Sequence, residues 1–291
     1  MKINHKHIAK FSSLILYIFN FFNYFFNFKS NEIRVLVYHH IESTKFKDFR
    51  DQLYFIKKKW KFITPKQFED HINGKIKLKG KNVLLSFDDG FNSNFEIEKK
   101  ILNKLNIKCI FFVPSNFISI KKINDAQNFV KKNILDQNFP SDFNKVKNMT
   151  IKNLKKLICN GHTIGSHTKN HVNLGSINNN KILKNELIES ATDLEKKLNT
   201  KIKHFAFTYG NYESMNEKSL KLAFKQYDYV YSGLRGGNYR NKKNQIIKRD
   251  AVYLKYGNNL LSIFINGIID LKYFFQILSI NKKINKIKKG I

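Results

Sequence analysis

One short segment of the 291-residue chain places two acidic side chains next to each other. It reads Ser86-Phe87-Asp88-Asp89-Gly90 and directly follows a run of apolar residues. Adjacent carboxylates both stay ionised only beside a cation or hydrogen-bond donors. One of them can then bind a cation while the other acts as a base. The alternative is an ordinary Asp-Asp-Gly turn that merely ends a strand.

A second segment places histidines at a spacing suited to metal binding. Residues 161–171 read Gly-His-Thr-Ile-Gly-Ser-His-Thr-Lys-Asn-His, so His167 and His171 are four residues apart. On a helical turn this spacing puts both imidazoles on one face, where they can share a metal ion. A carboxylate from another strand end would complete a ligand set common in hydrolytic metal sites. His162 has no such partner and is expected to be a packing or hydrogen-bonded histidine.

Two further segments carry polar groups at the ends of strand-like runs. Val35 to Tyr38 leads into His39 and His40, either of which could act as a general acid or contact a substrate. Two polar residues that simply close a strand are the alternative. Phe205 to Phe207 leads into Thr-Tyr-Gly, which on its own is typical of a turn. None of the nine histidines follows His204, so a catalytic histidine must come from the earlier part of the chain.

The elements that would position these residues alternate along the chain. Apolar runs rich in β-branched residues indicate buried strands, and stretches with helical periodicity lie between them. This alternation predicts an α/β fold with a parallel sheet, in which polar residues at the carboxyl ends of strands form the active site. Residues 116–148 show little periodicity and are expected to be a loop that shapes a substrate groove. We expect strands at 33–38, 82–87, 109–113, 162–166, 204–207 and 229–232, and helices at 46–60, 95–105, 150–160, 180–198 and 218–225.

Together the motifs resemble those of the polysaccharide deacetylases of carbohydrate esterase family 4, also called the NodB-homology domain. Residues 86–90 match the family's first motif, T/S-F-D-D-G, and residues 167–171 match its second, H-S/T-x-x-H. Residues 205–210 are a degenerate form of the third, R-x-P-Y-G. The resemblance spans about residues 33–255, and the start Val37-Tyr38-His39-His40 is similar to the poly-N-acetylglucosamine deacetylase branch.

The resemblance implies a fold, a cofactor and a role for each motif residue. The fold would be a distorted (β/α)7 barrel. Asp88 would be the general base, and Asp89, His167 and His171 would hold a divalent metal, most often zinc, with cobalt or nickel tolerated. Tyr209 would donate its backbone N–H to the oxyanion of the tetrahedral intermediate. The implied reaction is the removal of N-acetyl groups from amino sugars of a glycan.

The chain departs from the family pattern at three points. Ala206 stands where the third motif has an arginine that partners the catalytic aspartate, and Arg249 is a candidate replacement. Thr208 stands where proline is usual. The late L-x-H motif that supplies the general acid is absent, so His39 is the candidate acid, with His40 as a further candidate. These departures leave two alternatives open: a deformylase or deacetylase of a lipid-linked amino sugar, and an inactive glycan-binding relative.

The two ends of the chain differ from the body. Residues 1–30 combine three lysines with the apolar stretch 11–28 and resemble an anchor or a signal-like segment. Residues 31–255 would form the deacetylase domain, and 256–291 a basic amphipathic helix and tail that packs on the domain or lies on a membrane. These features predict a protein of the cell envelope or membrane surface, although they leave its side of the membrane open.

The overall charge is strongly basic. The chain has 53 Lys and Arg against 22 Asp and Glu, a net charge of +31, which indicates either an anionic partner such as a membrane surface or compositional drift. No zinc-finger or RNA-recognition motif is present, which argues against nucleic acid as the partner. The two cysteines, Cys109 and Cys159, do not make a disulfide framework, and Cys109 is expected to be a small buried residue.

Overall fold

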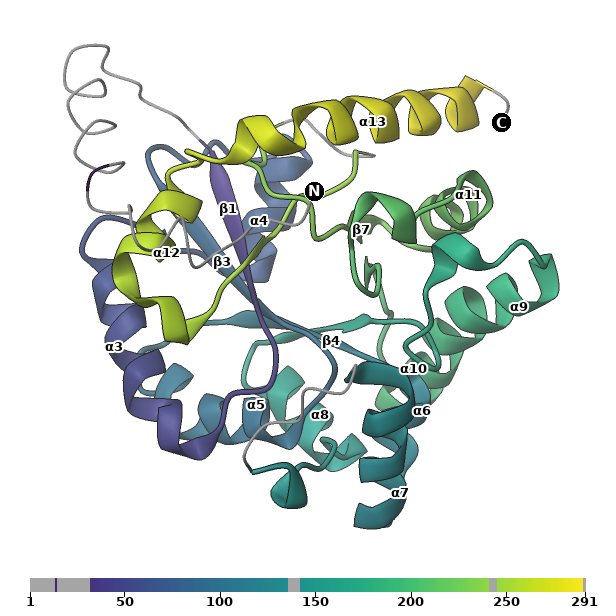
Figure 1. Cartoon of the computed structure of the whole chain (residues 1–291), viewed down its shortest axis with the longest axis horizontal. Coiled ribbons are helices and arrows are strands. Elements are labelled where there is room, and N and C mark those ends of the chain that lie inside the picture. Colours follow the sequence, from purple (N-terminus) through teal and green to yellow (C-terminus); the bar gives the residue numbers. More distant parts are fainter. Residues whose placement is uncertain (1–13, 15–31, 136–141, 241–244, 290–291) are drawn as a thin grey trace.

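The core of the protein is one parallel sheet wrapped by helices (Figure 1). The computed structural model describes residues 14, 32–135, 142–240 and 245–289. The strands run in the order β7-β6-β5-β4-β3-β1-β8, and β2 pairs with β3. Their bounds are β1 Ile33–Tyr38, β2 Lys61–Phe62, β3 Asn82–Phe87, β4 Cys109–Val113, β5 Thr163–Ser166, β6 His204–Ala206, β7 Tyr229–Tyr231 and β8 Asp250–Ala251.

The segment that leads into β8 joins the two sides of the sheet. Ile247 forms a parallel bridge with Tyr231 of β7, and three residues later Asp250 pairs with Leu36 of β1. The sheet therefore curls into a distorted barrel, which confirms the fold class predicted from the sequence. Because all strand pairs are parallel, their carboxyl ends gather at one end of the barrel.

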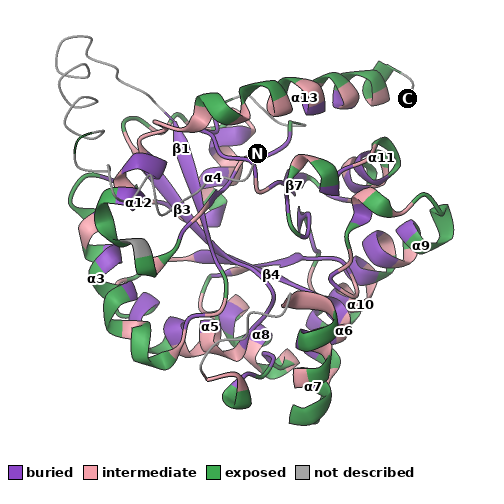
Figure 2. Ribbon diagram, viewed as in Figure 1, coloured by how far each residue is buried: buried purple, intermediate pink, exposed green. Residues whose placement is uncertain are grey.

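The strands form where the sequence supplies continuous apolar runs. Every residue of β1, β3 and β4 is buried, as expected of a parallel sheet covered on both faces. Figure 2 shows the buried strands in purple at the centre and helices that are green on their outer sides. Amphipathic helices supply the outer layer: Phe49, Leu53 and Ile56 of α3 are buried, whereas its charged residues face outward.

Eleven described helices surround or extend the sheet. Short π-helical turns continue α5 and α7 and join α9 to α10, so the predicted helices at 95–105 and 180–198 are each one continuous element. Thr150 caps α8 in a capping box with Asn153, as its sequence indicates. The bounds are α3 Phe46–Lys57, α4 Pro65–Ile72, α5 Asn92–Ile97, α6 Ser115–Ser119, α7 Ile123–Phe129, α8 Ile151–Cys159, α9 Asn180–Lys184, α10 Ser190–Leu198, α11 Glu217–Gln226, α12 Gly257–Ile265 and α13 Phe274–Lys289.

The prediction that residues 116–148 form a loop was wrong. Most of the described part of this segment is helical: α6, then α7 with its π-helical continuation Val130–Ile134. Phe117, Ala126 and Val130 form a small core of their own with Phe91. The apolar positions are few and lie among lysines and asparagines, so the helical period was not visible in the sequence. The short elements β2, α4 and β8 were also missed.

The C-terminal region forms the predicted helices. Ile280 and Ile284 of α13 are buried in the main core, and the Ser279 hydroxyl lies 2.9 Å from the Tyr212 hydroxyl. Among the described residues no single helix is long and apolar enough to cross a membrane. Gly257–Ile265 and Asp270–Lys289 pass that test only together, as a pair bent by 58°. The predicted anchor at 1–30 lies, apart from Leu14, outside the described residues.

Candidate active site

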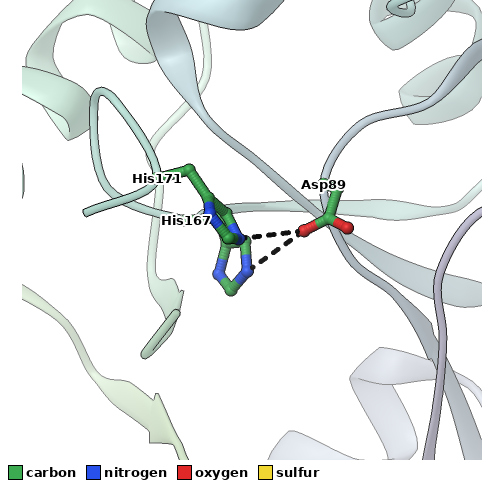
Figure 3. Close-up of side chains that lie close together, drawn as sticks. All are labelled: Asp89, His167 and His171. Atoms are coloured by element: carbon green, nitrogen blue, oxygen red, sulfur yellow. Dashed lines mark ion pairs between the residues drawn. The ribbon is translucent and has the colours of Figure 1, made fainter. Parts of the chain in front are cut away.

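Three side chains from two strand ends form a compact group at the carboxyl end of the barrel (Figure 3). Asp89 follows β3, and His167 and His171 follow β5. Asp89 Oδ1 lies 3.2 Å from His171 Nε2 and 3.6 Å from His167 Nε2. All three residues are buried, and one ligand atom from each lies within 4.8 Å of the others. The sequence predicted this grouping, and the structure brings the three residues together.

The backbone at this group has an unusual conformation. Six non-glycine residues of the described chain have positive φ, and two of them are asparagines, which adopt this conformation readily. The other four are Asp89, Thr168, His171 and Tyr209, all at this end of the barrel. Residues held in such conformations concentrate at functional sites. The expectation that a helical turn pairs His167 with His171 was wrong, because a loop with two left-handed residues brings them together.

Each histidine is oriented by a backbone carbonyl. His167 Nδ1 lies 2.8 Å from the carbonyl oxygen of Ala206, and His171 Nδ1 lies 2.7 Å from that of Asn133. A carbonyl only accepts hydrogen bonds, so each Nδ1 carries the proton and each Nε2 presents its lone pair towards Asp89. Asp89 Oδ1 is fully buried and accepts no hydrogen bond from the described residues. A buried carboxylate oxygen facing two imidazole lone pairs fits a bound cation.

Asp88 points to the same site and forms an ion pair with Arg249. The guanidinium donates from Nη1 to Oδ1 at 2.7 Å and from Nη2 to Oδ2 at 2.9 Å. Its Nε donates to the carbonyl oxygen of Ser232 at 2.9 Å, and the group lies over the ring of Phe112. Arg249 thus partners Asp88, although it comes from the segment before β8 and not from the position of Ala206.

These groups lie in the wall of a cavity of about 490 Å³, which is within the size range of ligand sites. Asp88, Asp89, His167, His171 and Arg249 form its polar part. Ile134 and Leu135, where the segment that continues α7 ends, form another part of the wall. The remaining lining residues are Val37, His39, His40, Phe91, Phe207, Tyr209, Gly233, Ala251 and Tyr253.

Comparison with known families assigns the chain. Residues 75–231, more than half of it, match the profile described as polysaccharide deacetylase. The chain belongs to the polysaccharide deacetylase family. The resemblance seen in the motifs is thereby confirmed, and the deacetylase is a hydrolase that acts on amide bonds of acetylated sugars. No curated protein matches its sequence.

Solved structures share the fold of the deacetylase. IcaB from Ammonifex degensii is 20% identical, with a TM-score of 0.63 over 80% of this chain and 97% of its own. The deacetylase PplD from Streptococcus pyogenes is 19% identical, with a TM-score of 0.62 over 80% and 98%. A de-N-acetylase from Aggregatibacter actinomycetemcomitans is 17% identical, with a TM-score of 0.62 over 80% and 99%. At such low identity these likenesses establish the barrel alone.

The charges of the deacetylase's site balance one another. Burial raises the pKa of Asp88, but Arg249 and His167 outweigh it and hold the pKa below its usual range. Burial also raises the pKa of Asp89, which the neighbouring His171 lowers by more. Burial lowers the pKa of His167 to about 4, so its imidazole is neutral at neutral pH, as a metal ligand must be. Burial lowers the pKa of His171 too, but without a metal Asp89 raises it above its ordinary value, so a bound cation competes with a proton on Nε2.

The two N-terminal histidine candidates have different surroundings. His39 is exposed at the mouth of the cavity. His40 is partly buried, and its ring nitrogens lie 2.9 Å from Ser93 Oγ and 3.0 Å from Asp142 Oδ1. His40 is therefore tied to the cavity wall, whereas His39 faces the space where a substrate would lie.

Tyr209 lies at a tight turn on the rim. Its ring is 59% exposed, and its centroid is 5.4 Å from that of His171. The next residue, Gly210, has φ +63°, and a Cβ there would lie 2.3 Å from the backbone nitrogen of Gly233, so only glycine fits. Thr208, in place of the usual proline, donates its hydroxyl hydrogen to the carbonyl of Val172 and so anchors the turn.

Two contributors to the site could not be found from sequence patterns. The carbonyl of Asn133 orients His171, and backbone groups leave no signature in a sequence. Tyr253 lines the cavity from beyond the third motif. His162, by contrast, is the packing histidine that the sequence predicts: Nδ1 accepts the Cys109 N–H at 3.0 Å, and Nε2 lies 3.4 Å from Glu98.

Proposed function

We propose that this deacetylase hydrolyses the N-acetyl group of amino-sugar residues in a glycan, with a divalent metal, zinc, held by Asp89, His167 and His171. The observation that carries the proposal is the buried three-ligand group with an uncompensated carboxylate oxygen, next to the Asp88–Arg249 pair in one cavity wall. The printed names of the structural neighbours support it, because one is a de-N-acetylase and another is a deacetylase in complex with acetate.

The donor set favours zinc over magnesium or calcium. Two imidazoles and one carboxylate suit zinc, and cobalt or nickel accept similar ligands, whereas magnesium and calcium prefer oxygen. When bound, the cation supplies Lewis acidity to the amide carbonyl and to the attacking water. The two carbonyls of Ala206 and Asn133 fix the imidazole rings before any metal arrives, which lowers the cost of assembling the site.

Asp88 is the group that takes the proton from the attacking water. Its Oδ2 lies 3.7 Å from His167 Nε2, but both of its oxygens accept hydrogen bonds from Arg249, so the carboxylate borders the metal group without belonging to it. Arg249 fixes both oxygens and keeps the carboxylate ionised, because it offsets the burial that would otherwise raise the pKa. The carboxylate is therefore held in one orientation and stays ionised at neutral pH. Its lowered pKa also makes it a weaker base.

The remaining steps need a donor for the oxyanion and an acid for the leaving amine. The backbone N–H of Tyr209, held at the turn before Gly210, is the proposed donor to the oxyanion. His39 lies at the cavity mouth, where the sugar nitrogen would leave, and is the proposed general acid. A His39→Ala variant that retains full turnover would remove this histidine from the mechanism.

The test is acetate release from N-acetylglucosamine oligomers by the chelator-treated protein, with and without added zinc. We expect zinc to restore release, and Asp88→Asn to abolish it while zinc still binds. Asp51→Asn, an exposed carboxylate of α3, is the matched control and should behave as wild type. No release from a zinc-loaded, folded wild-type protein on these oligomers would contradict the proposal and favour an inactive glycan-binding role.

A further inference from the structure

The C-terminal helix α13 has two faces of different character. Its inner face packs against α11 and the barrel, where Ile280 and Ile284 are buried. Lys283 lies over the ring of Tyr212 and Lys286 lies 3.8 Å from Glu217, so the helix is held along its length. The outer face therefore has a fixed position relative to the barrel, at the edge of the molecule in Figure 1.

Large apolar side chains gather on the outer face at the start of α13. Leu271 is 82% exposed and Phe275 is 79% exposed, more than any other large apolar side chain among the described residues. The Phe274 ring centroid lies 5.5 Å from that of Phe275, Leu278 follows one helical turn after Phe274, and both Phe274 and Leu278 are exposed. We call these four residues the apolar ridge. Single exposed apolar residues are ordinary on a protein surface, but a cluster indicates a partner.

The lysines of α13 follow the apolar ridge along the same helix. Helix α13 contains no acidic residue, and its lysines are Lys282, Lys283, Lys286, Lys288 and Lys289. Asp270, just before the ridge, is engaged by Arg34 at 2.6 Å. A surface that combines exposed Leu and Phe side chains with lysines fits a partner that is apolar inside and anionic at its surface.

We propose that the apolar ridge and the exposed lysines Lys282 and Lys289 of α13 dock the protein on an anionic lipid bilayer. The ridge enters the interface between headgroups and acyl chains, and the lysines contact the anionic headgroups. A second copy of the chain could cover the ridge, but it would leave the lysines without an anionic partner. Nucleic acid would leave the ridge without an apolar environment.

The position of α13 in the fold sets the orientation on the bilayer. The ridge adjoins Asp270, which binds Arg34 near the start of β1, and the lysine-rich end reaches Glu217, which begins α11 after the Tyr209 turn. The helix thus runs along the side of the barrel for about 24 Å, at 1.5 Å per residue. A docked barrel lies on its side, and its active-site cavity opens along the plane of the membrane. The apolar stretch 11–28 also precedes β1 by only a few residues.

The test is flotation of the purified full chain with vesicles of phosphatidylcholine alone or mixed with phosphatidylglycerol. We expect binding to the anionic vesicles that weakens as salt is added. Leu271→Ser with Phe275→Ser should lower partitioning about tenfold or more, because two exposed apolar side chains no longer enter the interface. Ile182→Ser, an exposed apolar residue of α9, is the matched control and should bind as wild type.

The lysines have their own test. Lys282→Gln with Lys289→Gln should weaken binding to anionic vesicles about tenfold, and Lys155→Gln with Lys156→Gln on α8 should have little effect. Absence of binding to anionic vesicles, or binding that the ridge substitutions leave unchanged, overturns the proposal. Dimers in solution that the ridge substitutions dissociate would identify a second copy as the occupant. Acetate release from soluble oligomers should be unchanged in all these variants, so the docking proposal can fail without the proposed reaction failing.

Discussion

Two buried Arg–Asp pairs with nearly the same geometry lie on neighbouring residues of one strand segment. Arg249 binds both oxygens of Asp88 at 2.7 and 2.9 Å, and Asp250 accepts two hydrogen bonds from Arg34, both at 2.8 Å. All four side chains are almost completely inaccessible to solvent. Residue types, distances and burial therefore do not separate the two pairs.

Their surroundings separate them. Each guanidinium nitrogen of Arg34 donates at least one hydrogen bond, to Asp250, to Asp270 or to the carbonyl of Phe264, and Asp250 also faces Arg235. Neither Arg34 nor Asp250 lines the active-site cavity. Asp88 instead borders the cavity and the metal-binding group. The Arg34–Asp250 pair lies away from the cavity, so it can only stabilise the fold. The carboxylate of the Arg249–Asp88 pair borders the cavity, so it can also act on a ligand.

The largest expected difference between the two pairs is in the free energy of unfolding. Arg34→Met leaves Asp250 and Asp270 buried without their main cation, so we expect the free energy of unfolding to fall by about 3–5 kcal/mol. Urea denaturation measures it. Turnover per folded molecule should stay near wild type. A variant of normal stability would show that the Arg34 pair is dispensable.

The matching change at the site should act on turnover. Arg249→Met leaves Asp88 buried without its bidentate partner, so the base is neither oriented nor kept ionised. We expect kcat to fall by about 10² to 10⁴-fold, the usual contribution of a positioned acid or base. Arg235→Met is the control, because Arg235 is equally buried but contacts Asp250, the Ala251 carbonyl and the Phe264 ring and does not line the active-site cavity. Equal losses of kcat in the two variants would show that the Arg249–Asp88 pair has no special role in turnover.

The sequence could predict the parts of this contrast that depend on local patterns. Buried strands with polar residues at their ends predicted the parallel sheet and a carboxylate near His167 and His171, whereas the barrel and the choice of Asp89 followed from the resemblance of the motifs to the family. Arg249 was reachable only as a compensating candidate for Ala206, because nothing local marks an arginine as a site residue. Its position follows from the closing of the barrel through Ile247 and β8, which is a long-range event.

Two features could not be predicted from the sequence. One depends on unusual backbone conformations, and the other is a helical segment with few apolar residues. The loop that pairs His167 with His171 depends on left-handed residues at Thr168 and His171, and a β-branched threonine rarely adopts this conformation. The helical segment 115–134 is stabilised by a few apolar residues packed on Phe91, which a lysine- and asparagine-rich sequence conceals. The same segment carries the Asn133 carbonyl, so missing the helix also meant missing the group that orients His171.

His162, just before β5, extends the contrast to pH. His162 Nδ1 accepts the Cys109 N–H, so protonation of this nitrogen would break that bond, and burial lowers the pKa of His162 to about 4. The unfolded chain therefore binds the proton first as the pH falls. Stability should be full above about pH 6.5 and decline by about 3 kcal/mol towards pH 4. In zinc-loaded protein, His162→Asn should remove this slope, and an unchanged slope would assign it to other groups.

The smallest expected effect concerns the shape of the Arg249 side chain. Arg249→Lys keeps the positive charge but replaces a two-pronged donor with a single ammonium, which cannot hold both oxygens of Asp88 at once. We expect kcat to fall about tenfold, equivalent to one lost charge-assisted hydrogen bond. Because Arg249 helps to lower the pKa of Asp88, its weaker substitute should move the acid limb of the pH–rate profile to higher pH. A tenfold loss without that movement would mean that Arg249 orients the carboxylate and leaves its proton affinity to His167.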